Sequence, residues 1–146
     1  MTFEDWSDRG WLRTYRTSRD EVAALLAIAD RDLANSQTPG LACEWRLAIA
    51  YNAALQAATA ALAACGYRVA QGQPHHLRAI RSLALTIGMD DARVLQFDGF
   101  RRKRNLSSYD RAGSVSEQEA LEMLDFARRL RQDVETWLRK EHPGLV

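Results

Sequence analysis

One alanine-rich stretch decides the fold: Leu47-Ala-Ile-Ala-Tyr-Asn-Ala-Ala-Leu-Gln-Ala-Ala-Thr-Ala-Ala-Leu-Ala-Ala-Cys65. With the residues just before it, the stretch predicts a helix from about Leu41 to Cys65, which Gly66 ends. Its apolar residues surround the helix instead of forming one stripe, so the helix belongs in the middle of a bundle. The many alanines let neighbouring backbones come close. The polar exceptions are interpreted as satisfied groups in or beside the core: Tyr51, Asn52 and Gln56.

Apolar residues also recur at helical spacing on both sides of this stretch, while proline and glycine fall between the periodic segments. Capping boxes begin two of the segments, at Ser18–Glu21 and Ser116–Glu119. The sequence therefore predicts an all-α fold, an up-and-down bundle of four or five helices. Residues 1–17 are predicted to be an aromatic-rich segment that packs on the body as a short helix or cap, and residues 18–142 a single bundle domain. The apolar positions expected to face the core include Val22, Leu26, Ala29, Trp45, Leu55, Leu62, Ile80, Leu83, Val94, Leu95, Phe97, Phe100, Leu121, Leu124, Leu130 and Val134.

Length and charge limit the possible functions. At 146 residues the chain is long enough for one domain with its own core. The formal net charge is only +1, so any attraction to nucleic acid must come from a local patch. The opening residues lack the basic start and apolar run of a signal peptide, and the apolar stretch of the central helix is expected to be too short to cross a bilayer. A cytoplasmic protein is therefore expected.

The two cysteines, Cys43 and Cys65, lie on the predicted central helix. A rise of 1.5 Å per residue places them roughly 33 Å apart, whereas a disulfide needs Cα atoms within about 7 Å. We interpret them as buried thiols in a reducing compartment.

The densest basic run is Arg101-Arg102-Lys103-Arg104, which the polar segment Asn105-Leu-Ser-Ser-Tyr109-Asp110 follows. On an uninterrupted helix, Arg101 and Arg104 share one stripe, whereas Tyr109 lies roughly 140° from Arg104. Because Asn105 and the serines compete with helical backbone bonding, we expect Arg104 on the last helical turn and Tyr109 swung back by the following loop.

Such a cluster would offer guanidinium forks for phosphate oxygens, and Tyr109 would add a hydroxyl and a ring on which a base can stack. The alternative is a solvated run of charge, stabilised by its position near a helix C-terminus.

His75 and His76 fall in the first turn of a predicted helix, after Pro74. The positive end of the helix dipole favours neutral imidazole there, which could serve as a base or ligand. The alternative is a pair of surface histidines. No carboxylate or further histidine lies at helical ligand spacing, so a metal site is not expected.

Two blocks of this sequence resemble the HEPN (higher eukaryotes and prokaryotes nucleotide-binding) superfamily. The first runs from Ala50-Tyr51-Asn52 through Ala61-Leu62 and Gly66 to His75-His76, and is similar to the family's small-residue tyrosine helix, glycine loop and histidine. The second, Arg104-Asn105-x-x-x-Tyr109, stands in the place of the family's arginine, polar residue, spacer and histidine. The likeness covers roughly residues 18–140.

The resemblance implies a bundle that dimerises so that the two motifs face each other across a shared cleft. In active members this cleft cuts RNA without a metal: the arginine stabilises the scissile phosphate, and the histidine helps a ribose 2′-hydroxyl attack. Arg104 and Asn105 match the motif, whereas Tyr109 replaces the histidine and Asp110 occupies the next permitted spacing. Tyrosine, with a pKa of about 10, is a poorer general base at neutral pH than histidine at about 6.5.

Three hypotheses follow. The first is a homodimeric toxin–antitoxin component that binds RNA or nucleotide, with weak or absent ribonuclease activity; Arg104, Asn105 and Tyr109 are its candidate catalytic residues. Arg101, Arg104, His75 and His76 would contact phosphate. The second is a non-enzymatic partner or substrate of a minimal nucleotidyltransferase, with Tyr109 as the modification site, which the resemblance also implies. The third is a plain bundle with a solvated arginine cluster. No residues indicate a dedicated cofactor.

Overall fold

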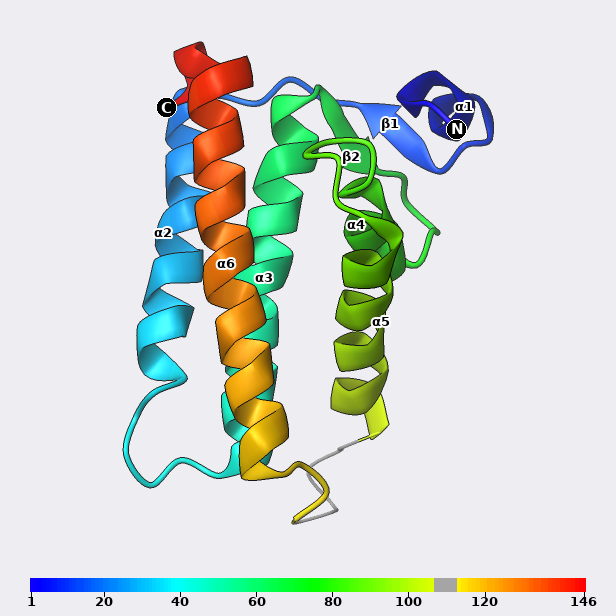
Figure 1. Cartoon of the computed structure of the whole chain (residues 1–146). Coiled ribbons are helices and arrows are strands. Elements are labelled where there is room, and N and C mark those ends of the chain that lie inside the picture. Colours follow the sequence, from blue (N-terminus) through cyan, green and yellow to red (C-terminus); the bar gives the residue numbers. More distant parts are fainter. Residues whose placement is uncertain (107–112) are drawn as a thin grey trace.

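The computed structural model describes residues 1–106 and 113–146 (Figure 1). Within these ranges the predicted all-α fold is confirmed, and a two-stranded antiparallel ribbon is added to it. The long helices α2, α3, α5 and α6 run in alternating directions along the bundle. In chain order the elements are α1 (Phe3–Asp8), β1 (Leu12–Thr14), α2 (Arg19–Asn35), α3 (Cys43–Ala64), β2 (Tyr67–Val69), α4 (His75–Ser82), α5 (Asp91–Leu106), α6 (Glu117–Glu141) and the 3-10 helix η1 (Pro143–Leu145).

Helix α3 is the centre of the protein, in contact with α2, α6, α4 and α5 (Figure 1). Most of its alanines are buried, so neighbouring helices pack closely against it, as the sequence predicts. By length and composition α3 could cross a bilayer, contrary to the sequence-based expectation, but 67% of its most apolar window is buried inside the protein. Such burial is that of a core helix. Cys43 begins α3 and Cys65 is its C-cap, so the two thiols lie at opposite ends of the helix, as predicted, but both are partly exposed rather than buried because they lie at the helix ends.

Three predicted core positions are instead exposed: Trp45 at 45%, Leu95 at 65% and Leu121 at 41%. Helix α5 packs mainly against α3 and α4 and reaches α6 through Phe97 and Phe100, and Leu95 lies outside this buried face. On α6 the buried face begins with Ala120 and Met123 rather than with Leu121. The predicted helical spacing was therefore right, but which side of each helix faces the core depends on the neighbouring helices.

The predicted capping boxes differ in outcome. At α6, Ser116 and Glu119 bond reciprocally to each other's backbone amides, as predicted. At α2, the Ser18 hydroxyl accepts from the Glu21 amide, but the Glu21 carboxylate accepts from the hydroxyls of Tyr15 at 2.5 Å and Thr17 at 2.7 Å. The second half of that box was wrong because two side-chain hydroxyls reach the carboxylate.

Two strands were missed. Residues 1–17 contain the expected short helix, but β1 follows it and pairs with β2, in a segment predicted to be a loop. Gly66, with φ of 91°, turns the chain from α3 into β2. Each strand has only three residues, too few for an alternating pattern to be visible in the sequence. The ribbon has its own small core: Trp6, Leu12, Leu62 and Val69.

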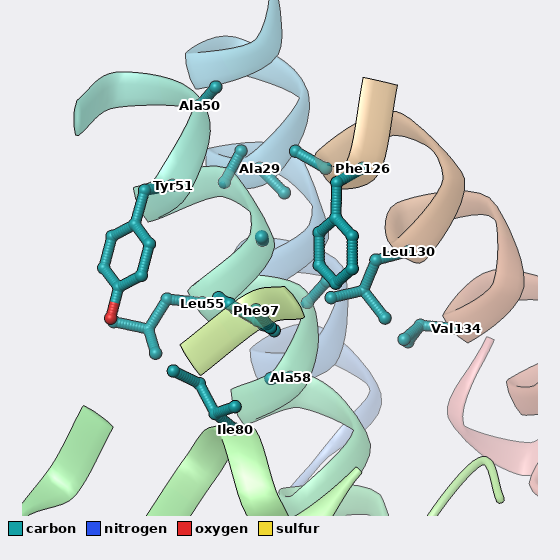
Figure 2. Close-up of a cluster of buried hydrophobic side chains, with 14 of the residues drawn as sticks. Ala29, Ala50, Tyr51, Leu55, Ala58, Ile80, Phe97, Phe126, Leu130 and Val134 are labelled. Carbon is teal, nitrogen blue, oxygen red and sulfur yellow. The ribbon is translucent and has the colours of Figure 1, made fainter. Parts of the chain in front are cut away.

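The main core is centred on Phe97, which is fully buried (Figure 2). Its ring packs edge-on against Tyr51 of α3 and against Phe126 of α6, with centroid separations of 5.7 and 5.1 Å. Leu55, Leu130 and Val134 are drawn around it in Figure 2. Phe97 therefore joins α5 to both α3 and α6 and fixes the position of the basic run at the end of α5.

A buried polar contact joins α2 to α3. The Asn52 amide donates to the carboxylate of Asp32 at 2.6 Å, and Asp32 is only 6% exposed. The exposed Arg31 holds the other carboxylate oxygen at 3.1 Å. Gln56 approaches Asn52 at 3.4 Å. The interpretation of Asn52 and Gln56 as satisfied polar groups beside the core is confirmed.

Asn52→Ala is expected to lower the free energy of unfolding by about 1.5–3 kcal/mol, because a buried carboxylate loses a charge-assisted hydrogen bond. Urea denaturation followed by circular dichroism measures the change. Asn35→Ala, at an exposed position at the end of α2, is the matched control and should change stability by less than about 0.5 kcal/mol. Equal effects of the two substitutions would show that the Asp32 contact contributes nothing.

Candidate functional site

Three helices bring Tyr51, His76 and Arg104 together. Tyr51 is in the first half of α3, His76 in the first turn of α4, and Arg104 in the last turn of α5. The Tyr51 hydroxyl lies 3.0 Å from His76 Nδ1. The Arg104 guanidinium lies over the Tyr51 ring, with its Cζ 5.2 Å from the ring centroid. These three residues are called the Tyr51 cluster below.

Tyr51 is held rigidly, because its side chain is 1% exposed and packs against Phe97. Figure 2 shows it at one edge of the buried cluster. Burial raises the pKa of Tyr51 to about 12, although the nearby charges of Arg104 and Arg101 act in the opposite direction. The phenol therefore keeps its proton at neutral pH and cannot act as a base.

The state of Tyr51 determines the state of His76. The Tyr51 hydroxyl and His76 Nδ1 share one hydrogen bond, in which either group can donate. If Nδ1 donated, the buried Tyr51 proton would have no acceptor among the described residues, and an unsatisfied buried donor is costly. Burial, followed by the positive charges of Arg104 and Arg101, lowers the pKa of His76 below its ordinary value. We infer a neutral ring that accepts at Nδ1 and carries its proton on Nε2. His76 is then a hydrogen-bond donor at this site, not a ready general base.

The basic run divides into cations with different surroundings. Arg101 and Arg102 share the carboxylate of Asp98, at 2.7 and 3.4 Å. Lys103 contacts Glu119 of α6 at 3.1 Å, so it joins two helices, contrary to the alternative that the whole basic run is solvated charge. Arg101 is nevertheless close enough to the Tyr51 cluster for its charge to act on Tyr51 and His76. Arg104 and Arg101 thus face the same site, as their shared helical stripe predicts.

The other predicted site residues fall into two groups. His75 and Asn105 are exposed, and no hydrogen bond or ion pair within the described residues places either in the Tyr51 cluster. Tyr109 and Asp110 lie outside the described residues, so the predicted approach of Tyr109 to Arg104 stays a prediction. Tyr51 itself was missed as a site residue, although it belongs to the first block of the family resemblance.

The arrangement can bind an anion. It combines two guanidinium groups with a neutral imidazole N–H, next to a buried tyrosine ring. Among residues 1–106 and 113–146, no group of three His, Cys, Asp or Glu side chains could hold a metal ion. No family model, curated protein or solved structure matches the chain.

The His76 ring is expected to titrate with a midpoint below about 6.5, the ordinary value for histidine, because burial and the two arginines oppose its protonation. The unfolded chain then binds more protons than the folded protein below about pH 6.5. The stability that the neutral His76 ring contributes is therefore present above that pH and is lost as the pH falls. Nitrogen-15 NMR of the ring measures both the midpoint and the tautomer.

Arg104→Ala should raise the midpoint of His76, since it removes a neighbouring positive charge while burial remains. Arg102→Ala is the matched control, because the Arg102 side chain is 63% exposed and bound to Asp98. A midpoint at or above 6.5 in the parent protein, or a proton on Nδ1, would contradict the inferred state of the ring.

Proposed function

We propose that this chain is a HEPN-like protein that binds single-stranded RNA or nucleotide, as a homodimer, through Arg104, Arg101 and the Nε2 group of His76. The observation that carries the proposal is the contact between the two sequence blocks that resemble the family. Tyr51 and His76 come from the first block and Arg104 from the second, and they meet although 25 and more residues separate them along the chain.

The chemistry of the cluster supports phosphate as the bound group. Guanidinium groups match phosphate oxygens with two parallel hydrogen bonds, and an imidazole N–H adds a neutral donor. The same residues supply no base: Tyr51 holds its proton, and His76 uses Nδ1 to accept it. We therefore propose binding with weak or absent cleavage, and Tyr109 does not change this expectation because a tyrosine hydroxyl is a poor base at neutral pH.

The test is a titration of fluorescein-labelled single-stranded RNA by fluorescence anisotropy, at salt concentrations from 50 to about 200 mM. Saturable binding that weakens steadily with salt is expected, because neutralised phosphates release counterions. The same RNA, incubated with excess chelator and separated on a denaturing gel, reports cleavage. Sedimentation gives the mass of the protein in solution, which should be that of a dimer because a shared cleft requires two copies of the chain. If the protein is a monomer that binds neither RNA nor mononucleotide, the proposal is wrong, and the protein is a helical bundle with a solvated arginine cluster.

The second candidate is a non-enzymatic toxin–antitoxin component that a minimal nucleotidyltransferase binds and modifies at Tyr109. The absence of a ready base among the described cluster residues favours it. Intact-mass spectrometry after incubation with such an enzyme and nucleotide would show a nucleotidyl adduct on the parent protein and none on Tyr109→Phe. An adduct that persists in the variant would place the modification elsewhere.

A further inference from the structure

A second site lies under the β1–β2 ribbon, between α2, α3 and α4. It is a pocket of about 590 Å³, within the range of roughly 300–1,000 Å³ that small-molecule sites occupy. Its apolar wall is formed by Leu25, Leu55, Leu62, Val69 and Ala79, and Glu21, Thr59, Gln71 and the two histidines add polar groups. Arg13 and Arg68 stand at its edge on the two strands.

The two arginines form an unusual pair. Arg13 and Arg68 are direct cross-strand partners in the ribbon, an arrangement in which like charges repel and destabilise the sheet. Both guanidinium groups lie over the Tyr15 ring, with Cζ atoms 5.9 and 4.3 Å from its centroid. Tyr15 thus holds two positive charges on the same side of the ribbon, facing the pocket.

The nearby negative charge is too small to balance them. Glu21 also lines the pocket, and hydrogen bonds from Tyr15 and Thr17 lower the pKa of its carboxyl, so it is ionised. Both arginines are solvent-exposed, so with one carboxylate beside two guanidinium groups the exposed side of the pocket carries an excess of positive charge. Within residues 1–106 and 113–146, neither Arg13 nor Arg68 has an ion-pair partner within 4.0 Å.

We propose that this pocket binds a small monocarboxylate with an apolar body, such as a medium-chain fatty acid. The carboxylate supplies the one missing negative charge and accepts paired hydrogen bonds from the guanidinium forks. The hydrocarbon body fills the space between Leu25, Leu55 and Leu62, and this removal of apolar surface from water favours binding. An amine or a neutral alcohol of the same length can pack against the apolar wall but cannot form an ion pair with the arginines.

The pocket is separate from Arg101 and Arg104, the two arginines proposed to bind phosphate. His76 borders both sites, since its ring lines the pocket and bonds Tyr51, but Arg101 and Arg104 are not among the pocket residues. The proposal therefore does not rest on RNA binding, and a protein that fails to bind RNA can still bind the carboxylate.

Isothermal titration calorimetry with decanoate, below its micelle concentration, tests the proposal against decan-1-ol and decylamine. Saturable binding of decanoate with a stoichiometry of one is expected, with the alcohol and the amine binding at least about tenfold more weakly, since a hydrogen bond to a charged group is worth at least one tenfold step in affinity. Equal binding of decan-1-ol, or no saturable binding of decanoate, would overturn the proposal.

Variants locate the site. Arg13→Gln and Arg68→Gln should each weaken decanoate binding about tenfold, and the double variant should abolish the preference over the alcohol while retaining RNA binding. Arg16→Gln, an exposed arginine just beyond β1 that does not line the pocket, should bind like the parent. Thr59→Phe, which fills the pocket from α3, should exclude the ligand. Thermal unfolding checks that each variant is folded, and unchanged affinity in the folded double variant would refute the assignment.

Discussion

Phe97→Ala is expected to lower the free energy of unfolding by about 3–5 kcal/mol, the range for removing a buried aromatic ring from a protein core. The side chain is fully buried, and its ring packs edge-on against Tyr51 and Phe126. Phe126 in turn packs against Phe100, so the cavity would open between three helices and could not close by moving one side chain. Urea denaturation followed by circular dichroism measures the loss.

Leu95→Ala is the matched control, because Leu95 is on the same helix but 65% exposed. It should change stability by less than about 0.5 kcal/mol, and both variants should give the same dependence on urea as the parent if unfolding is two-state. A loss below about 1.5 kcal/mol for Phe97→Ala would mean that the core collapses around the cavity, in contradiction to the interlocked aromatic packing.

The helices could be predicted because their signals are local. The central alanine-rich helix was recognisable because it is apolar on most faces, and α3 occupies the centre of the protein as that pattern predicts. The capping box at Ser116 was likewise readable from two residues. The β1–β2 ribbon could not be predicted, because its pairing of Leu12 with Val69 joins residues far apart in the chain and because three-residue strands carry no periodic signal.

The site could be predicted only in part, for a similar reason. Placing Arg104 on the last turn of its helix needed only helical geometry. The meeting of Tyr51, His76 and Arg104 depends on how three helices rotate and pack, and that follows from long-range contacts such as Phe97 against Tyr51. The family resemblance named the two blocks that meet, but residue spacing alone could not show that the tyrosine hydroxyl would use Nδ1 of His76.

Arg104→Ala is expected to weaken RNA binding by about 10- to 100-fold, the cost of losing charge-assisted hydrogen bonds to phosphate. It should also reduce the dependence of log affinity on log salt by about one, because one fewer phosphate is neutralised. Fluorescence anisotropy at several salt concentrations measures both quantities. The substitution leaves Phe97 and the core in place, so the fold should remain cooperative and the loss should be confined to binding.

Two comparisons separate the role of the guanidinium from that of charge alone. Arg104→Lys retains the positive charge but loses the planar fork and most of the stacking on Tyr51, so its affinity should fall between those of the parent and Arg104→Ala while the salt dependence stays near that of the parent. Arg102→Ala removes an equal charge that is 63% exposed and shared with Asp98, and should weaken binding only slightly. If Arg102→Ala and Arg104→Ala weaken binding equally, RNA is held by diffuse charge along α5, and the converging geometry of Tyr51, His76 and Arg104 has no part in it.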